Sequence, residues 1–178
     1  LFRSQLFELT GRDAEAIAGW MSDLREQRRF RVDEGTFARV REQFASDSID
    51  NATCLDTIKR VFDEHDYLLD PHTAVAYRTA ENLRGENPVL IASTAHWAKF
   101  GDNVYRALHG LEPGAALPAD VAALSGCALN ELIAQETGKH DIPRGLAELD
   151  ALPIRFDEVI EGGTDSIEAA AARFLEEL

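Results

Sequence analysis

Apolar residues recur along much of the chain with the spacing of amphipathic helices. One helix is predicted from four residues at positions i, i+3, i+4 and i+7, namely Ile17, Trp20, Met21 and Leu24. Asp13 precedes them and suits the N-cap of that helix. Three further stripes predict helices at Phe37, Val40 and Phe44; at Leu55, Ile58 and Phe62; and, near the end of the chain, at Ile167, Ala171, Phe174, Leu175 and Leu178. The first half of the chain is therefore predicted to be mostly helical.

A sharper signal for the start of a helix stands at Asp70-Pro71. Asp is a preferred N-cap residue, and Pro suits the first helical position, where a backbone N–H would lack an intrahelical partner anyway. The helix is expected to end at Gly85, with Val75, Thr79 and Leu83 along it.

Residues 88–93 form a short, continuous apolar run between turn residues, which is typical of a buried strand. Residues 153–159 are a weaker candidate for a short edge strand, limited by the proline at its start. One central strand cannot satisfy its own edges. Either further strands escape detection, or the chain docks onto a sheet supplied by another part of a protein.

Between these strand candidates the pattern is again helical. A helix is predicted over residues 103–108, followed by a Gly- and Pro-rich loop over 110–118. Two short helices are predicted over 118–137, and residues 139–152 are expected to be irregular. The sequence shows neither an internal repeat nor a low-complexity segment.

Composition excludes several classes of protein. The 178 residues include 32 Asp and Glu against 18 Lys and Arg, a net charge of −14, which argues against nucleic acid and anionic membranes as partners. There is no run of about 20 apolar residues that would span a membrane. The two cysteines, Cys54 and Cys127, form no paired motif, which favours a reducing compartment and hence the cytoplasm. Because the chain begins at Leu1, we expect it to be a piece of a longer protein.

Few segments carry recognisable chemistry. The five histidines lack the spacing of metal ligands, and the chain contains no nucleophile-elbow, Walker or dinucleotide-binding motif, so neither a metal site nor a catalytic residue is predicted. Ser93 and Thr94 follow the predicted strand, where α/β proteins often bind ligands. A hydroxyl there also caps helices, and the residues alone favour this second role for Ser93 or Thr94.

Two boxes carry a resemblance to a known family. Residues 68–75 are Leu-Leu-Asp-Pro-His-Thr-Ala-Val, and residues 93–100 are Ser-Thr-Ala-His-Trp-Ala-Lys-Phe. In this order and spacing they resemble the C-terminal part of threonine synthase, a pyridoxal-phosphate enzyme of the tryptophan-synthase-β-like fold. The resemblance runs from about residue 1 to 106, and the family usually has proline where Trp97 stands. It implies an α/β fold class, this chain being a helix-rich C-terminal fragment.

The resemblance also implies an activity. Threonine synthase converts O-phosphohomoserine and water to threonine and phosphate, with pyridoxal 5'-phosphate joined to a lysine as a Schiff base. That lysine and the loop for the cofactor phosphate lie upstream of the matched region, and none of the three lysines, Lys59, Lys99 and Lys139, matches it. The expected partners are therefore the substrate and the upstream N-terminal portion, and the fragment is not expected to be active alone. Residues 1–110 would belong to the cofactor-binding large domain, and 111–178 to an extension packing on it.

Within the boxes, Thr94 matches the hydroxyl that hydrogen-bonds the pyridine nitrogen of the cofactor in this family. A neutral donor leaves that nitrogen unprotonated, which makes the ring a gentler electron sink. Ser93 and His96 are further candidates for cofactor binding. His96 would line the pocket or orient Thr94, or else be a satisfied buried imidazole. Asp70 and His72 are expected to fix the start of a helix rather than to touch substrate.

Two alternative functions stay open from the sequence. The first alternative is a non-catalytic helical interaction module. The second is part of another pyridoxal-phosphate lyase, such as a serine or threonine dehydratase. The box at residues 68–75 favours threonine synthase over the dehydratases.

Overall fold

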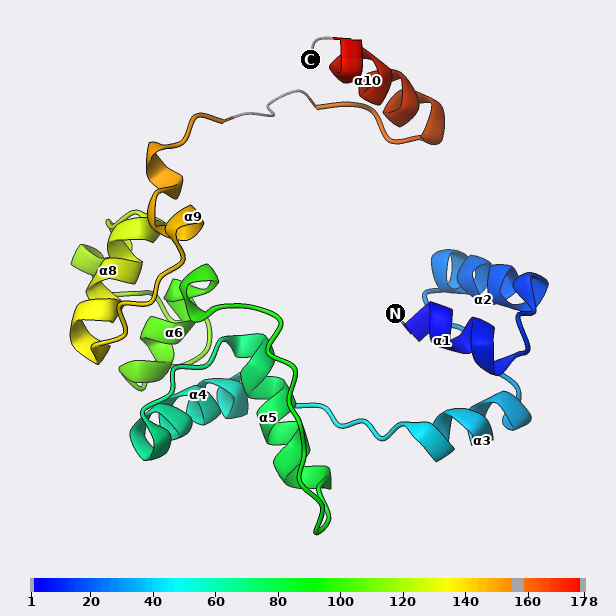
Figure 1. The fold of residues 1–178 in the computed structure, drawn as a ribbon, viewed down its shortest axis with the longest axis horizontal. Helices are drawn as coiled ribbons and strands as arrows, with labels where there is room; N and C mark the ends of the chain where they lie inside the picture. Colours follow the sequence, from blue (N-terminus) through cyan, green and yellow to red (C-terminus); the bar gives the residue numbers. More distant parts are fainter. Residues whose placement is uncertain (1, 155–158, 177–178) are drawn as a thin grey trace. The chain divides into compact units, whose positions relative to one another are not determined.

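The computed structural model describes residues 2–154 and 159–176, and these residues are mainly helical (Figure 1). The elements in chain order are α1 (Phe2–Leu9), α2 (Ala14–Gln27), α3 (Glu34–Gln43), α4 (Asn51–His65), α5 (Pro71–Leu83), the 3-10 helix η1 (Trp97–Lys99), α6 (Gly101–Leu108), α7 (Ala119–Ala122), α8 (Gly126–Thr137), α9 (Arg144–Ala147), the 3-10 helix η2 (Leu149–Ala151) and α10 (Thr164–Glu176). The helix-rich character predicted from the sequence is confirmed.

The chain divides into two compact units, residues 1–115 and 116–178, and each is considered by itself. The division of roles predicted from the sequence, 1–110 in a large domain and 111–178 as its extension, stays a prediction.

Aspartates begin four of the helices of the first unit. Asp13 accepts a hydrogen bond from the N–H of Ala16 at the start of α2, and Asp50 accepts one from Thr53 at the start of α4. Asp33 and Asp70 cap α3 and α5 in the same way. A side-chain oxygen here satisfies an N–H that the first helical turn leaves without a partner. The predicted N-caps at Asp13 and Asp70 are confirmed.

Helix α4 is the centre of packing in the second half of this unit. It contacts both α5 and α6. Its apolar face buries Ile58 and Val61, and Val104 of α6 is also fully buried. Leu68 and Leu69 in the turn after α4 are buried as well, so the chain enters α5 with its direction fixed by the core.

One ion pair joins α4 to α5. Arg60 donates to Glu81 across 2.6 Å, and Arg78 donates to the same oxygen across 3.2 Å. Burial of Glu81 would raise its pKa, but hydrogen bonds from the two arginines outweigh burial, and its pKa is lowered. The folded carboxylate therefore binds its proton less readily than the unfolded one.

Glu81→Gln is expected to lower the free energy of unfolding at pH 7 by about 1 kcal/mol, because it removes this partly exposed pair. The folded pKa lies below the unfolded value near 4.5, so the pair contributes fully above that pH and its contribution is lost as pH falls through the folded pKa. Urea denaturation of both proteins at several pH values measures this. A difference that stays constant into strong acid would contradict the assignment.

The predicted strand at residues 88–93 is wrong for this chain. No strand occurs in the parts of the chain that the structure describes, and Leu90 is 98% exposed beside the half-exposed Val89. A strand needs a neighbouring strand to pair its backbone groups, and residues 2–154 and 159–176 offer none. The second strand candidate, residues 153–159, lies partly outside the described residues; its described ends are not in a strand.

The second unit contains short helices. Val121, Leu129 and Ile133 form its buried apolar centre, and Ser125 caps α8. The prediction of two helices over 118–137 is confirmed. The prediction of an irregular segment over 139–152 is wrong, because that segment holds α9 and η2.

Local signals explain why α9 forms in the segment that was predicted to be irregular. Pro143 stands directly before α9 with a fixed φ of −56°, and Arg144 pairs with Glu148 one turn later across 2.9 Å. Turns this short have too few residues to show a period. The predicted C-terminal helix is confirmed as α10, in which no described residue is buried.

Candidate functional site

The start of α5 is built on a buried carboxylate. Asp70 is 2% exposed, and its Oδ1 accepts hydrogen bonds from the N–H groups of His72 (2.9 Å) and Thr73 (3.2 Å). Its Oδ2 accepts a hydrogen bond from the hydroxyl of Thr73. Pro71 holds the first helical position. The expectation that Asp70 fixes a helix start is confirmed, and His72 contributes its backbone N–H, while its ring contacts that of Phe100 edge-on.

The Thr73 hydroxyl links this cap to the second box. Its Oγ1 lies 3.1 Å from Oγ of Ser93, twenty residues further along the chain. Ser93 also lies 3.3 Å from the carbonyl oxygen of Ala95. Thr73 is buried, whereas Ser93 is exposed. The two boxes that were separate in the sequence therefore meet through a chain of hydrogen bonds from Asp70 to Ser93.

A cavity of about 310 Å³ adjoins this contact. Its lining combines apolar, aromatic and polar side chains: Val61, His65, Tyr67, Leu69, Thr73, Tyr77, Ile91 and Ser93. The hydroxyls of Thr73 and Ser93 thus border a space that is otherwise mostly apolar, which is the usual character of a small-molecule site.

Thr94 and His96, the other two predicted site residues, lie next to Ser93 along the chain. The Thr94 side chain is exposed and makes no hydrogen bond with the residues that the structure describes. His96 is half-buried, and its Nδ1 accepts the N–H of Ala98 across 3.2 Å, which caps η1. The structure places Ser93 against Thr73.

This arrangement corrects one interpretation of the sequence. Ser93 or Thr94 was expected to cap the following helix, but the cap of η1 is His96, and α6 has no side-chain cap. Imidazole is an unusual cap, since Ser, Thr, Asp and Asn are the preferred residues. The hydroxyls of residues 93 and 94 are therefore not used to begin a helix.

Trp97 replaces the proline usual in the resembled pattern without changing the type of backbone. His96, which precedes it, has φ −122° and ψ 143°, the extended conformation that a residue before proline adopts. The indole is 3% exposed, and among the described residues its Nε1 has no hydrogen-bond partner. The tryptophan at this position is therefore part of the buried core.

Thr73 is the member of this candidate site that the sequence did not predict. It stands inside the box at residues 68–75, three positions after the N-cap. A threonine there looks like part of a helix start, and its contact with Ser93 is long-range. One signal in the sequence could have indicated it: both boxes, residues 68–75 and 93–100, belong to the same family resemblance.

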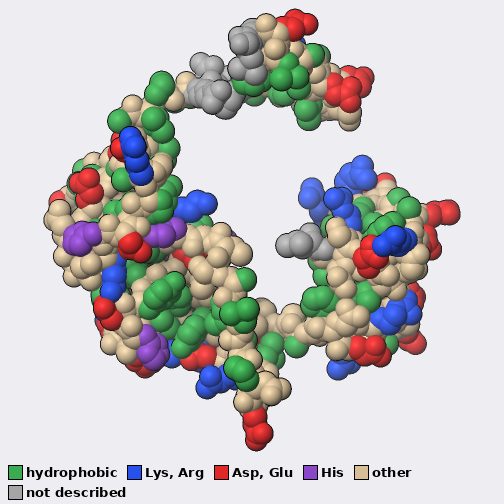
Figure 2. Space-filling view, in the orientation of Figure 1, with side chains coloured by type: hydrophobic (Ala, Val, Ile, Leu, Met, Phe, Trp, Pro, Cys, Tyr) green, Lys and Arg blue, Asp and Glu red, His purple; other side chains and the backbone are tan. Residues whose placement is uncertain are grey.

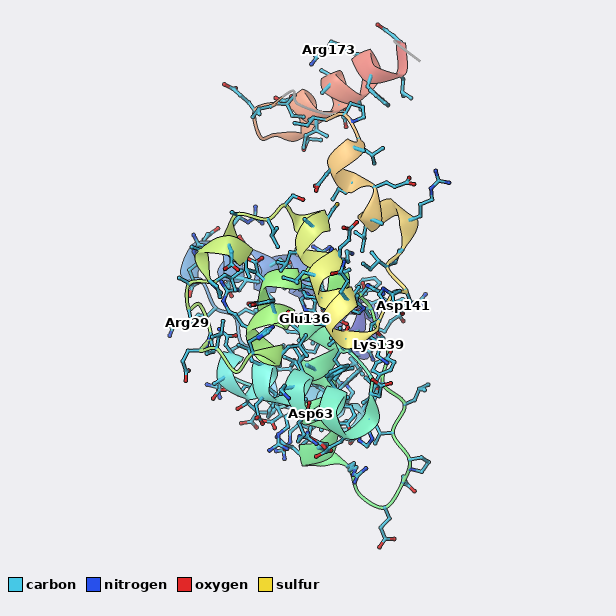
Figure 3. The ribbon with its side chains drawn as sticks, turned by 90° about the vertical axis from the view of Figure 1, so that its left-hand side faces the viewer. Arg29, Asp63, Glu136, Lys139, Asp141 and Arg173 are labelled. Atoms are coloured by element: carbon cyan, nitrogen blue, oxygen red, sulfur yellow. The ribbon has the colours of Figure 1, made fainter. Side chains whose placement is uncertain are left out.

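Two further reactive side chains, Cys54 and Lys59, lie on α4. Cys54 donates from its thiol to the carbonyl of Pro71 across 3.4 Å; burial, aided by the nearby Asp70 charge, raises the pKa of that thiol. Such a cysteine is a poor nucleophile. Lys59 pairs with Asp63 one turn later on the same helix; Asp63 is labelled in Figure 3. Within 2–154 and 159–176 there is no group of three His, Cys, Asp or Glu side chains that would hold a metal.

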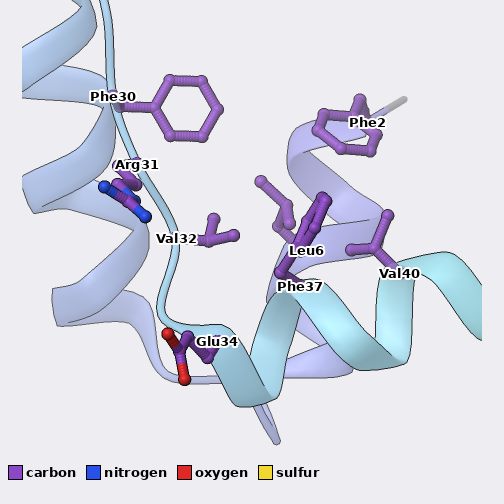
Figure 4. A pocket seen from close by; sticks show the side chains of 8 residues that line it. All are labelled: Phe2, Leu6, Phe30, Arg31, Val32, Glu34, Phe37 and Val40. Carbon is purple, nitrogen blue, oxygen red and sulfur yellow. The ribbon is translucent and has the colours of Figure 1, made fainter.

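The distribution of charge on the surface does not point to a particular kind of partner. On the face shown in Figure 2, acidic and basic side chains are interspersed rather than gathered by sign. No helix of the described chain is both long enough and apolar enough to cross a membrane. A second cavity, of about 420 Å³, is mainly apolar (Figure 4) and is lined by Phe2, Leu6, Phe30, Arg31, Val32, Glu34, Phe37 and Val40.

Comparison with known proteins gives a consistent result. Residues 73–128 match the family model "Threonine synthase, C-terminal". The chain is 33% identical over 125 residues to threonine synthase of Pseudomonas aeruginosa, covering 69% of this chain and 26% of that protein. It is 30% identical over 101 residues to human threonine synthase-like 1, covering 56% of this chain and 14% of that one. The chain thus matches only a minor part of these relatives.

Two solved structures are also similar. The PLP-bound threonine synthase from Brucella melitensis aligns with a TM-score of 0.54 and 29% identity, over 78% of this chain and 31% of that one. The yeast threonine synthase aligns with a TM-score of 0.61 and 23% identity, over 99% of this chain and 34% of that one. The second likeness concerns the fold alone. Together these findings confirm the resemblance that the two boxes carry.

Proposed function

We propose, from the resemblance of this chain to the C-terminal part of threonine synthase, that it is that portion of a pyridoxal-phosphate-dependent enzyme. The complete enzyme would convert O-phosphohomoserine and water to threonine and phosphate in cytoplasmic amino-acid biosynthesis. The observation that carries the proposal is that the family match, residues 73–128, contains the whole constellation of Thr73, Ser93, Thr94 and His96.

The donor set fits the cofactor's ring nitrogen. Pyridoxal phosphate, when bound, supplies an electron sink that stabilises negative charge developing on the substrate. The Thr94 hydroxyl would donate a hydrogen bond to the nitrogen. Ser93 and His96 would lie beside Thr94 in the same site. A hydroxyl is neutral and keeps its own proton, so it holds the nitrogen in place without protonating it.

The remaining parts of the site are proposed to come from the upstream N-terminal portion of the same protein. These are the lysine that binds the cofactor and the loop for its phosphate. The exposed apolar segment around Leu90 supports this, because it has the sequence of a buried strand without a sheet to join. In this view the upstream portion covers the exposed apolar residues of this segment.

Cofactor binding tests the proposal. Pyridoxal phosphate is added to this chain alone and to the longer protein that includes the upstream portion, and the absorbance of the bound cofactor is recorded. Binding is expected only for the longer protein, together with release of phosphate from O-phosphohomoserine. A longer protein that is folded and binds no cofactor would favour a non-catalytic interaction module instead. Cofactor binding with turnover of serine or threonine, and none of O-phosphohomoserine, would favour a dehydratase.

A further inference from the structure

The hydrogen-bond chain between the two boxes has a fixed direction, which follows from the number of protons in it. Asp70 offers a carboxylate, which only accepts. Its Oδ2 takes the single hydroxyl proton of Thr73. Oγ1 of Thr73 can then only accept from Ser93, 3.1 Å away. The other neighbour of the Ser93 hydroxyl, the carbonyl of Ala95, also only accepts.

Both partners of Ser93 therefore compete for its one proton. Whichever partner takes this hydrogen bond, the hydroxyl has no second proton to offer a ligand and can interact with one only through its lone pairs. Thr94 differs, since its hydroxyl makes no hydrogen bond within the described parts of the chain. Two adjacent hydroxyls that look equivalent in the sequence thus differ in what they can do: one can only accept, and the other can donate.

We propose that Asp70 and Thr73 are positioning residues that hold Ser93 as an acceptor and so leave Thr94 as the hydrogen-bond donor to an unprotonated ring nitrogen. This rests on the proposed function, because it concerns the same cofactor. The burial of Asp70 and Thr73, 2% and 5% exposed, suits a support that contacts no ligand itself. Ser93 would accept from a polar group of the cofactor or substrate beside the ring.

The test uses the longer protein and pyridoxal phosphate labelled with ¹⁵N in its ring. Two quantities are measured: the dissociation constant of the cofactor and the ¹⁵N chemical shift of the bound ring. Ser93→Ala is expected to leave the chemical shift unchanged and to weaken the affinity about tenfold, because one acceptor is lost, whereas Thr94→Val changes both the shift and the affinity. An altered ¹⁵N shift in Ser93→Ala with a normal one in Thr94→Val would overturn the assignment.

Thr73 is tested by a matched pair. Thr73→Val keeps the shape but removes the hydroxyl, and is expected to weaken cofactor binding about tenfold, the equivalent of one lost hydrogen bond. Thr73→Ser keeps the hydroxyl and is expected to bind like wild type. Equal affinities for the two variants would refute the positioning role. If Thr73→Val fails to fold, the Ser93 and Thr94 comparison still decides, and a wild-type protein that binds no cofactor refutes the proposed function instead.

Discussion

Replacement of Thr94 by valine in the longer protein is expected to weaken pyridoxal phosphate binding about 10- to 100-fold. Valine has nearly the shape of threonine but cannot donate a hydrogen bond. A nitrogen buried without its partner costs about 1–3 kcal/mol, and each 1.4 kcal/mol is a factor of ten in affinity. The side chain of Thr94 is exposed in this chain, so the fold of this part should not depend on it. Titration of the cofactor, followed by its absorbance, gives the affinity.

Thr94→Ser is the matched control for that variant, because it keeps the donor and loses one methyl group. It is expected to bind the cofactor within a few-fold of wild type. Unfolding curves of all three proteins should coincide. Unchanged affinity and an unchanged cofactor spectrum in Thr94→Val would remove Thr94 from the site.

Local signals explain why the helix starts were predictable from the sequence. The caps at Asp13 and Asp70 each need only residues within one turn, and the apolar stripes of α2 and α4 repeat inside a single helix. Such patterns are decided by the chain itself, whatever surrounds it.

Features that depend on distant residues were not predictable in the same way. The apolar run at residues 88–93 has the composition of a buried strand, but pairing requires a second strand, which the described residues do not provide. Composition indicates what a segment can become, and its partners decide whether it does. The short turns of α9 and η2 escaped for the opposite reason, since three or four residues are too few to show a period.

The residues of the candidate site also differ in whether they could be predicted from the sequence. Ser93, Thr94 and His96 came from the sequence through their place after an apolar run and through a family resemblance. Thr73 did not, because its contact with Ser93 joins residues twenty positions apart. The resemblance placed the two boxes in one family, and the structure adds the hydrogen bond that brings Thr73 and Ser93 together.

Asp70→Ala is expected to lower the free energy of unfolding by about 3–4 kcal/mol, the largest loss for any helix cap discussed above. The change removes a cap that serves two N–H groups, for about 1–2 kcal/mol, and deprives the buried Thr73 hydroxyl of a charged acceptor, for about 1.5–3 kcal/mol. Urea denaturation measures the loss, with an unchanged slope expected if the unfolding transition stays two-state.

Asp50→Ala is the matched control within the chain. Asp50 also caps a helix of the same unit, accepting from Thr53 across 2.7 Å, but it is exposed and supports no second box. Asp50→Ala is expected to lower the free energy of unfolding clearly less than Asp70→Ala does, because water can replace an exposed acceptor and cannot reach a buried one. Equal losses for the two caps would mean that Asp70 does no more than begin α5. A larger loss for Asp70, reproduced in part by Thr73→Val, would show that the cap and the second box are joined energetically as well as in space.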